Sequence, residues 1–368
     1  MSHPTTVWRY TLRFVAPAFL GDADQSGRWR TPPIKAQLRQ WWRVAYAAQH
    51  GHRVDVGAMR EAEAELFGAP GEGGGASGRS LVRLRLDRWD EGSLKKTQWR
   101  PLDKVPHPEV DRGVPTADLY LGYGPVTLKE GPLKANAAIQ ADEKASLSIG
   151  LTNRIGADDV SRLRCALHLM HRYGTLGGRS RNGWGSYVLE PLDGTPAWPA
   201  QPDASCLRPW RDALGLDWAH AIGSDQRGPL VWTTGAKADW RAAMVELARL
   251  KIGFRTGLPQ CDLALDARRG DRQIPEGIEH GTPRPRHWLA YPVKNHDVEA
   301  WKPLKLRLPN TLRFKLRPVA DGQVEGIVFH VPALPPPAFA PNRSEIVNLW
   351  RDIHQTLDAN PQLKRQPS

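Results

Sequence analysis

The feature that most constrains this chain is a glycine-rich segment, residues 174–187, which reads GTLGGRSRNGWGSY. Five of its fourteen residues are glycine, so the backbone lacks Cβ atoms where it must bend sharply or lie against a ligand. Arg179 and Arg181 stand between the glycines and can hold phosphates through bidentate hydrogen bonds, Asn182 adds a donor, and Trp184 can stack on a base. We therefore expect a loop that binds a nucleic-acid backbone.

The surroundings of this segment favour the same interpretation. No acidic residue occurs between Ser161 and Val188, so nothing in that stretch neutralises the arginines. The backbone N–H groups of Gly177, Gly178 and Gly183 are expected to cradle a phosphate. The alternative is a long connection that packs its own tryptophan, but packing alone does not require two arginines between glycines.

Composition points to a polyanionic partner. The chain has 368 residues, which is enough length for two domains. Its formal net charge of +12 favours polyanionic ligands such as nucleic acid. A merely basic soluble protein is the alternative. The cysteines, Cys165, Cys206 and Cys261, are far apart, which argues for a reducing compartment and against a disulfide framework or a cysteine-rich zinc site. With no signal peptide and no apolar run long enough to span a membrane, we expect a cytoplasmic protein without a cofactor.

The periodicity of the first half predicts an α+β fold. Strands and helices are expected in the order βαββαβ, which is typical of a ferredoxin-like, RRM-like sheet with two helices on one face. Their expected ranges are 7–15, 33–49, 81–86, 145–152, 157–173 and 185–190. A short helix is expected at 58–67, a linker at 68–78, and a large insertion at 90–144 that protrudes or is poorly ordered around 92–117.

The second half is less regular. Strands are expected at 230–233, 287–294, 311–318 and 326–331, and helices at 238–250 and 344–357. We interpret the chain as two ferredoxin-like domains, the second degenerate, with long loop insertions. The expected boundaries are an N-terminal domain over 1–195, a linker over 196–227 and a second domain over 228–368.

The first long helix carries a second basic feature. Lys35, Arg39 and Arg43 follow one another at i, i+4 and i+8 and so line one stripe of the helix, with Trp42 at its border. The loop before the helix adds Arg28 and Arg30. This pattern predicts an anion-binding surface, with a solvated basic face as the alternative.

Catalytic motifs are absent from the sequence. We find no H-E-x-x-H, Walker or G-x-S-x-G pattern. His168 and His171 lie three residues apart on one helix, where they could bind a metal, but a surface pair that faces RNA is the better interpretation without a third ligand. Loop carboxylates Asp22 and Asp24, or the histidines His50 and His52, are the candidates for phosphodiester cleavage.

Two motifs together resemble a known family. The glycine-rich segment, which closes a helix and opens a strand, is similar to the glycine-rich loop of the RAMP superfamily of CRISPR-associated proteins. Residues 30–43, RTPPIKAQLRQWWR, more narrowly resemble the first (Cmr-one) subunit of type III-B effector complexes, as does LYLGYG at 119–124. The resemblance covers about residues 7–190.

The resemblance implies a non-catalytic subunit with two ferredoxin-like domains that lies toward the 3′ end of the guide RNA and helps to engage target RNA. Its partners would be guide (CRISPR) RNA, target RNA and other RAMP subunits. The basic residues of the family's motifs map onto Arg30, Lys35, Arg39, Arg43, Arg179 and Arg181.

The sequence therefore predicts an RNA-binding structural subunit for antiviral defence. We expect basic groups from both motifs to converge on one face. The full expected RNA-binding set is Arg28, Arg30, Lys35, Arg39, Trp42, Arg43, Gly177, Gly178, Arg179, Arg181, Asn182 and Trp184. The alternatives are a RAMP-type endoribonuclease that uses His50, His52 or Asp24, and a protein–protein adaptor whose tryptophans form an interface.

Overall fold

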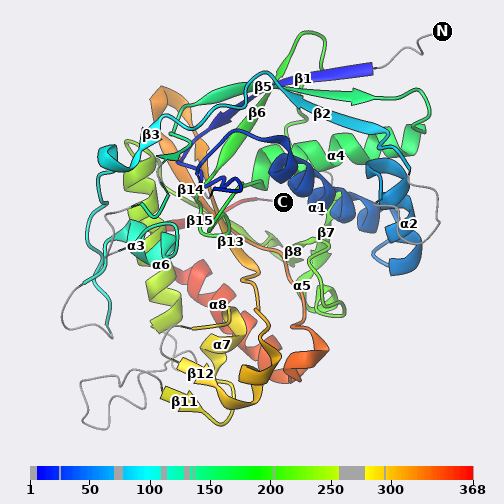
Figure 1. The fold of residues 1–368 in the computed structure, drawn as a ribbon. Coiled ribbons are helices and arrows are strands. Elements are labelled where there is room, and N and C mark those ends of the chain that lie inside the picture. The colour runs from blue at the N-terminus through cyan, green and yellow to red at the C-terminus, as the bar shows by residue number, and fades with distance from the viewer. Residues whose placement is uncertain are drawn as a thin grey trace. The chain divides into compact units, whose positions relative to one another are not determined.

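A computed structural model describes residues 6–24, 26–69, 78–108, 114–127, 133–135, 137–201, 204–256, 278–293 and 296–367. The chain divides into two compact units (Figure 1). Unit 1 comprises Met1–Arg100, Gly122–Leu207 and Lys315–Pro318, and unit 2 comprises Pro101–Leu121, Arg208–Phe314 and Val319–Ser368. Among the described helices, none is both long and apolar enough to cross a membrane.

Unit 1 is built on a four-stranded antiparallel sheet in the order β2-β5-β1-β6. The strands are β1 (Thr6–Phe14), β2 (Val82–Leu86), β5 (Lys144–Leu151) and β6 (Tyr187–Leu192). Burial alternates along β1, so that Trp8, Tyr10, Leu12 and Phe14 face the core while the residues between them face outward.

Two helices cover the inner face of this sheet (Figure 1). α1 (Thr31–Gln49) begins with prolines in its first turn, where the missing N–H costs no hydrogen bond. α4 (Ala157–Tyr173) carries Asp158 and Asp159 in its first turn, where the helix dipole favours acids. A third helix, α2 (Val56–Phe67), starts at Asp55, whose side chain accepts a hydrogen bond from the Ala58 N–H.

The segment expected as an insertion packs for much of its length. It contains β3 (Leu94–Lys95), the 3₁₀ helix η1 (Lys96–Gln98), α3 (Ala117–Gly122) and β4 (Ala137–Ala138). Trp99, Leu102 and Val105 are buried, so the expectation of a protruding stretch around 92–117 is wrong at these positions. Residues 109–113 lie outside the described part of the chain.

Unit 2 contains a four-stranded sheet in the order β13-β14-β10-β15. Its strands are β10 (Val231–Thr234), β13 (Leu312–Pro318), β14 (Val324–His330) and β15 (Leu363–Arg365), of which Lys315–Pro318 are grouped with unit 1. The helices α6 (Trp240–Thr256) and α8 (Arg343–Ala359) come between the strands in the sequence. The predicted α+β class with antiparallel sheets is confirmed.

Smaller elements complete the description. They are η2 (Ala204–Cys206), β7 (Leu207–Pro209), α5 (Trp210–Ala213), β8 (Ile222–Asp225), β9 (Gly228–Pro229), β11 (Ile278–His280), α7 (Pro285–Leu289), β12 (His296–Val298), η5 (Glu299–Leu304), η6 (Ala320–Gly322) and η7 (Pro337–Phe339). The strand expected at 287–294 is wrong, because α7 begins at Pro285 and buries Trp288 and Leu289. Several of these elements fall in the expected linker 196–227, where Trp210 is buried.

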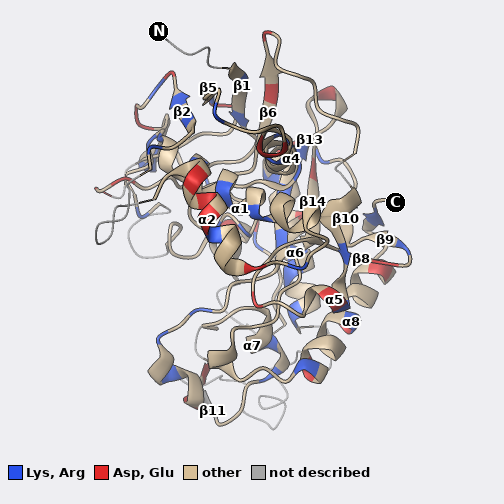
Figure 2. Ribbon diagram, turned by 90° about the vertical axis from the view of Figure 1, so that its right-hand side faces the viewer, with Lys and Arg blue, Asp and Glu red and all other residues tan. Residues whose placement is uncertain are grey.

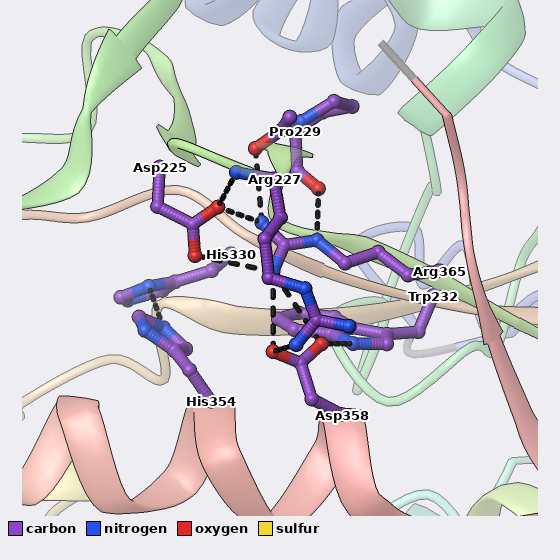
Figure 3. Close-up of polar contacts among 9 residues, drawn as sticks. Asp225, Arg227, Pro229, Trp232, His330, His354, Asp358 and Arg365 are labelled. Atoms are coloured by element: carbon purple, nitrogen blue, oxygen red, sulfur yellow. Dashed lines mark hydrogen bonds and ion pairs between the residues drawn. The ribbon is translucent and has the colours of Figure 1, made fainter.

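The last strand of unit 2 is held by a buried arginine (Figure 3). The Arg365 guanidinium lies 2.6 Å from Asp225 Oδ1 and 3.2 Å from Asp358 Oδ2, and it donates to the carbonyl oxygens of Gly228 and Pro229. Below it, the buried rings of His330 and His354 share a hydrogen bond of 2.9 Å.

Candidate nucleic-acid interface

The glycine-rich segment folds as a tight loop between α4 and β6. A bridge joins Thr175 to Ser186 at its base, and the Leu176 N–H donates to the Gly185 carbonyl. Gly185 has φ +63°, and a Cβ there would lie 1.9 Å from the Leu176 carbonyl oxygen. Glycine is therefore required at this position by both backbone conformation and space.

The loop is fastened to the segment that follows β1. The Gly178 N–H donates to the Phe19 carbonyl and the Gly185 N–H to the Pro17 carbonyl, at 2.9 and 2.8 Å. Within the loop, the Gly183 N–H donates to Ser180. The expected phosphate cradle is therefore wrong for Gly178 and Gly183, because their N–H groups already have acceptors inside the protein.

The aromatic residue of the loop belongs to the core. Trp184 is 0% exposed and packs on Phe19 and Trp99, with ring centroids 5.1 and 5.7 Å apart. The expectation that it stacks on a base is wrong, since no ring face reaches solvent. Asn182 is also buried, and its backbone N–H closes a turn onto the Arg179 carbonyl.

The two loop arginines differ from one another. Arg179 is exposed, has a left-handed backbone at φ +55°, and donates from Nε to the Tyr123 carbonyl at 2.6 Å. We also expected the two arginines to point the same way from an extended loop, but residues 178–181 form a turn. Burial lowers the pKa of the Arg181 guanidinium. No hydrogen bond or ion pair joins this side chain to the described residues, so Arg181 is a half-buried cation without a counter-charge.

The basic stripe of α1 is bound internally. Arg39 Nε lies 2.6 Å from Glu63 Oε1, and Arg43 Nε lies 2.8 Å from Glu63 Oε2. Burial alone would raise the pKa of the Glu63 carboxyl, but hydrogen bonds from Arg43 and Arg39 and their charges outweigh it, and the pKa is lowered. Lys35 Nζ donates to the Phe67 carbonyl at 2.8 Å. Figure 2 shows the acidic residues of α2 beside α1.

Most of the other residues expected on this basic surface also make contacts inside the protein. Trp42 is fully buried between Tyr46 and Phe67, which excludes it from base stacking. Arg28 pairs with Asp22 at 3.1 Å and donates to the Trp89 carbonyl. Arg30 stands directly before α1 and has a buried Nε with no hydrogen-bond partner.

These contacts decide which predicted residues come together. Arg39 and Arg43 both bind one internal carboxylate. The expectation that they converge with Arg179 and Arg181 on one RNA-binding face is therefore wrong as stated. The start of the glycine loop does touch α1, because Gln37 Oε1 accepts a hydrogen bond from the Thr175 N–H at 3.3 Å. Glu63 was missed, although the acidic character of residues 55–72 was the signal that could have found it.

Comparison with known proteins gives a family. The family model of the RAMP superfamily matches residues 11–188, a stretch that contains α1, α4 and the glycine-rich loop. Over this segment the chain is similar to the RAMP superfamily. None of the curated proteins matches the chain.

Several solved structures are similar to this chain at low sequence identity. Cmr1 from Pyrococcus furiosus, in an apo crystal structure, is 12% identical with a TM-score of 0.42 and 92% of each chain covered. A chain of the type III-B Cmr-beta complex bound to cognate target RNA is 10% identical with a TM-score of 0.47, covering 95% of this chain and 100% of that one. A chain of a type IV-B CRISPR complex is 14% identical with a TM-score of 0.33, covering 54% and 96%.

Three of the four candidate catalytic side chains, those of His50, His52 and Asp22, make internal contacts. His50 Nδ1 lies 2.8 Å from the Tyr46 carbonyl, and His52 Nε2 lies 3.0 Å from the Ser205 carbonyl. Asp22 Oδ1 accepts hydrogen bonds from the Asp24 and Ser26 N–H groups, as a turn-forming aspartate does.

The histidines of α4 pack in an aromatic stack. His168 and His171 lie 5.6 and 5.5 Å from the Trp198 ring, and Tyr10 covers the same tryptophan at 5.2 Å. The expected surface pair facing RNA is therefore wrong for His168, which is 4% exposed. Across the described residues, no group of three metal-ligating side chains occurs.

Proposed function

We propose that this chain is an RNA-binding structural subunit of a type III CRISPR effector ribonucleoprotein, resembling the Cmr-one subunit. It contacts the 3′ region of the guide RNA, the target RNA, or both. The RAMP match over residues 11–188 supports the class of protein. The observation that carries RNA binding is Arg181, a half-buried guanidinium for which the described part of the chain offers no partner.

Burial of the Arg181 guanidinium carries a desolvation cost. A buried cation without a counter-charge destabilises the fold unless an anion reaches it. The loop that carries Arg181 is fixed by the hydrogen bonds of Gly178 and Gly185. A phosphate that binds there meets a guanidinium already held in place, so little conformational entropy is lost on binding.

The architecture supports the same assignment. In each unit the principal sheet and its helices follow the order βαββαβ, and the strand order is the one that a ferredoxin-like fold has. We infer two ferredoxin-like domains, over about 1–195 and 228–368, joined by residues 196–227. Other RAMP subunits are the proposed protein partners, and no cofactor is required.

A structural role is favoured over a catalytic one. His50, His52 and Asp22 hold their own loops and helix end through the hydrogen bonds described above. A side chain engaged in this way is not free to abstract a proton from a ribose hydroxyl without first breaking those contacts.

The test measures the affinity of the full chain for single-stranded RNA by fluorescence anisotropy at several salt concentrations. Arg181→Ala should weaken binding and flatten the salt dependence by about 0.7 in slope for one lost phosphate contact. The matched control is Arg60→Ala, which removes an exposed arginine of α2 and changes net charge equally. If both variants bind alike, the loop is structural and the proposal is wrong.

A further inference from the structure

The outer face of the unit 1 sheet carries arginines that the family motifs do not include. Arg83 and Arg85 lie on β2, and Arg9 lies on β1. All three are exposed, while Val82, Leu86, Trp8 and Tyr10 beside them are buried, so the arginines project from the opposite face of the sheet. We call Arg9, Arg83 and Arg85 the sheet-face arginines.

The strand register places these side chains in neighbouring rows. Arg85 pairs with Ser148 of β5, and Ser148 pairs with Arg9 of β1. Arg83, the next outward residue of β2, pairs with Gly150 of β5. Since neighbouring strands lie about 4.8 Å apart, the arginine columns of β2 and β1 stand roughly 10 Å apart. Between these two columns, β5 presents only Ser148 and Gly150. Their side chains are short or absent, so the surface there is lower than on either side, and we call it the low floor.

The sheet-face arginines lack counter-charges. No ion pair or hydrogen bond joins any of the three guanidinium groups to a residue that the structure describes, and Arg9 is held to Thr195 only through its backbone N–H. On the same face, Asp142 and Glu190 both pair with Arg13, at 3.2 and 3.1 Å. Asp87 accepts a hydrogen bond from the Ser146 N–H and keeps its negative charge. The three sheet-face arginines outnumber this single carboxylate, so their end of the face has a net positive charge.

The chemistry of this face selects its ligand. Protein interfaces bury an apolar core, but the outward residues of these strands offer few exposed apolar side chains: Val7 is 38% exposed and Leu192, the partner of Arg9 on β6, is half-buried. The outward positions of β1, β2, β5 and β6 also hold no aromatic side chain, so bases have nothing to stack on. Positive charge with little aromatic or apolar surface fits the phosphates of a nucleic-acid backbone better than its bases or an apolar protein surface.

We propose that the outer face of the unit 1 sheet binds the phosphate backbone of single-stranded RNA through the sheet-face arginines, independently of base sequence. This proposal rests on the proposed function and adds to it a second contact surface besides Arg181. Guanidinium groups on either side of β5 hold phosphates along the low floor that Ser148 and Gly150 form.

The experiment compares two triple variants of the full chain. Arg9→Ala/Arg83→Ala/Arg85→Ala removes the proposed contacts. Arg53→Ala/Arg60→Ala/Arg307→Ala removes three other exposed arginines and matches the change in net charge. Binding to an oligouridine of about 20 nucleotides is measured by fluorescence anisotropy from about 0.05 to 0.3 M KCl.

We expect the sheet-face variant to lose at least about tenfold in affinity near 0.1 M KCl, with a salt slope shallower by about 2, which is what three lost contacts to a single strand give. The control variant should stay within about threefold of wild type. Arg9→Lys/Arg83→Lys/Arg85→Lys should keep the salt slope, because lysine retains the charge. Thermal melting checks that each variant folds, and the single variants Arg9→Ala, Arg83→Ala and Arg85→Ala are measured in turn if the triple alanine variant does not.

The outcomes separate this inference from the proposed function. If wild type binds RNA and Arg181→Ala weakens it while the sheet-face variant binds as well as its control, the inference is wrong and the function stands. If wild type does not bind RNA, both are wrong. If the sheet-face variant binds RNA normally but no longer co-purifies with other subunits, the face docks protein and the inference is wrong.

Discussion

The Arg39 Nε atom lies 2.6 Å from Glu63 Oε1, and the carboxylate that it meets is only 3% exposed. Arg43 binds the other oxygen of the same group at 2.8 Å. Two guanidiniums on α1 thus hold one buried carboxylate of α2. This arrangement assigns the basic stripe of α1 to helix packing and leaves the half-buried Arg181 as the stronger candidate for a ligand contact.

Substitution of Glu63 should therefore change stability more than RNA binding. Glu63→Gln removes the negative charge and replaces one of the two acceptor oxygens by an NH₂ donor, and we expect the free energy of unfolding in urea to fall by about 1–3 kcal/mol. Glu61→Gln, on the exposed side of α2, is the control and should change it by less than about 0.5 kcal/mol. A loss of RNA affinity in Glu63→Gln at a temperature where it remains folded would contradict the assignment.

The secondary structure of unit 1 could be predicted because local signals agree with the tertiary fold. Helix α4 was expected at 157–173 and has those bounds, since acids in its first turn and an apolar stripe point the same way. The second half failed at 287–294, where the aromatic run was read as a strand. There Trp288 packs edge-on against Trp301, with ring centroids 4.8 Å apart. A tertiary contact of this kind cannot be predicted from the local sequence pattern.

The candidate site was harder to predict for a related reason. Arginine and tryptophan serve equally in packing and in RNA binding, and only their partners distinguish the two roles. Trp184 packs on Phe19 and Trp99, and Arg43 binds Glu63, all distant in sequence. The glycine positions were more informative, because the positive φ of Gly185 depends on the backbone alone.

Acid should destabilise the protein through its buried histidines. Burial, together with the nearby charge of Arg172, lowers the pKa of His168 from 6.5 to about 4. The unfolded chain therefore binds protons first. The stability that the neutral side chain contributes is fully present above pH 6.5 and is lost as the pH falls toward 4, by up to about 3 kcal/mol.

His168→Phe isolates this effect, because phenylalanine can keep the stack on Trp198 but binds no proton. We expect denaturation curves at pH 8 to agree with wild type within about 1 kcal/mol. At about pH 4.5 the variant should be more stable by roughly 2 kcal/mol. Equal stability losses in both proteins between these pH values would show that His168 is not responsible.

The Arg365 cluster allows a comparison of two arginines on one carboxylate (Figure 3). Asp358 binds Arg365, whose side chain is 9% exposed, and Arg227, which is 63% exposed. Arg365→Ala leaves Asp225 and Asp358 without their buried partner and should lower the free energy of unfolding by about 3–5 kcal/mol. Arg227→Ala should cost less than about 1 kcal/mol, because solvent screens an exposed pair. Similar losses in the two variants would contradict the assignment.

The cysteines provide a further test, because two of them meet in the fold although they lie far apart in the chain. Cys165 Sγ on α4 and Cys206 Sγ lie 3.4 Å apart, and both are free thiols. With oxidised glutathione as the oxidant, the two thiols should pass two electrons to the reagent, release two protons and form one S–S bond. The bond joins two residues that lie 41 positions apart and so closes a loop of that length. It should therefore raise the free energy of unfolding by at most about 4 kcal/mol.

Thiol labelling and peptide mapping of the Cys261→Ser background follow this reaction without interference from the third cysteine. Adding Cys165→Ser to that background should abolish both the crosslink and the gain in stability. A crosslink that forms only in denaturant would mean that α4 and the segment around Cys206 do not pack as described, because the native fold would then hold the two sulfurs apart.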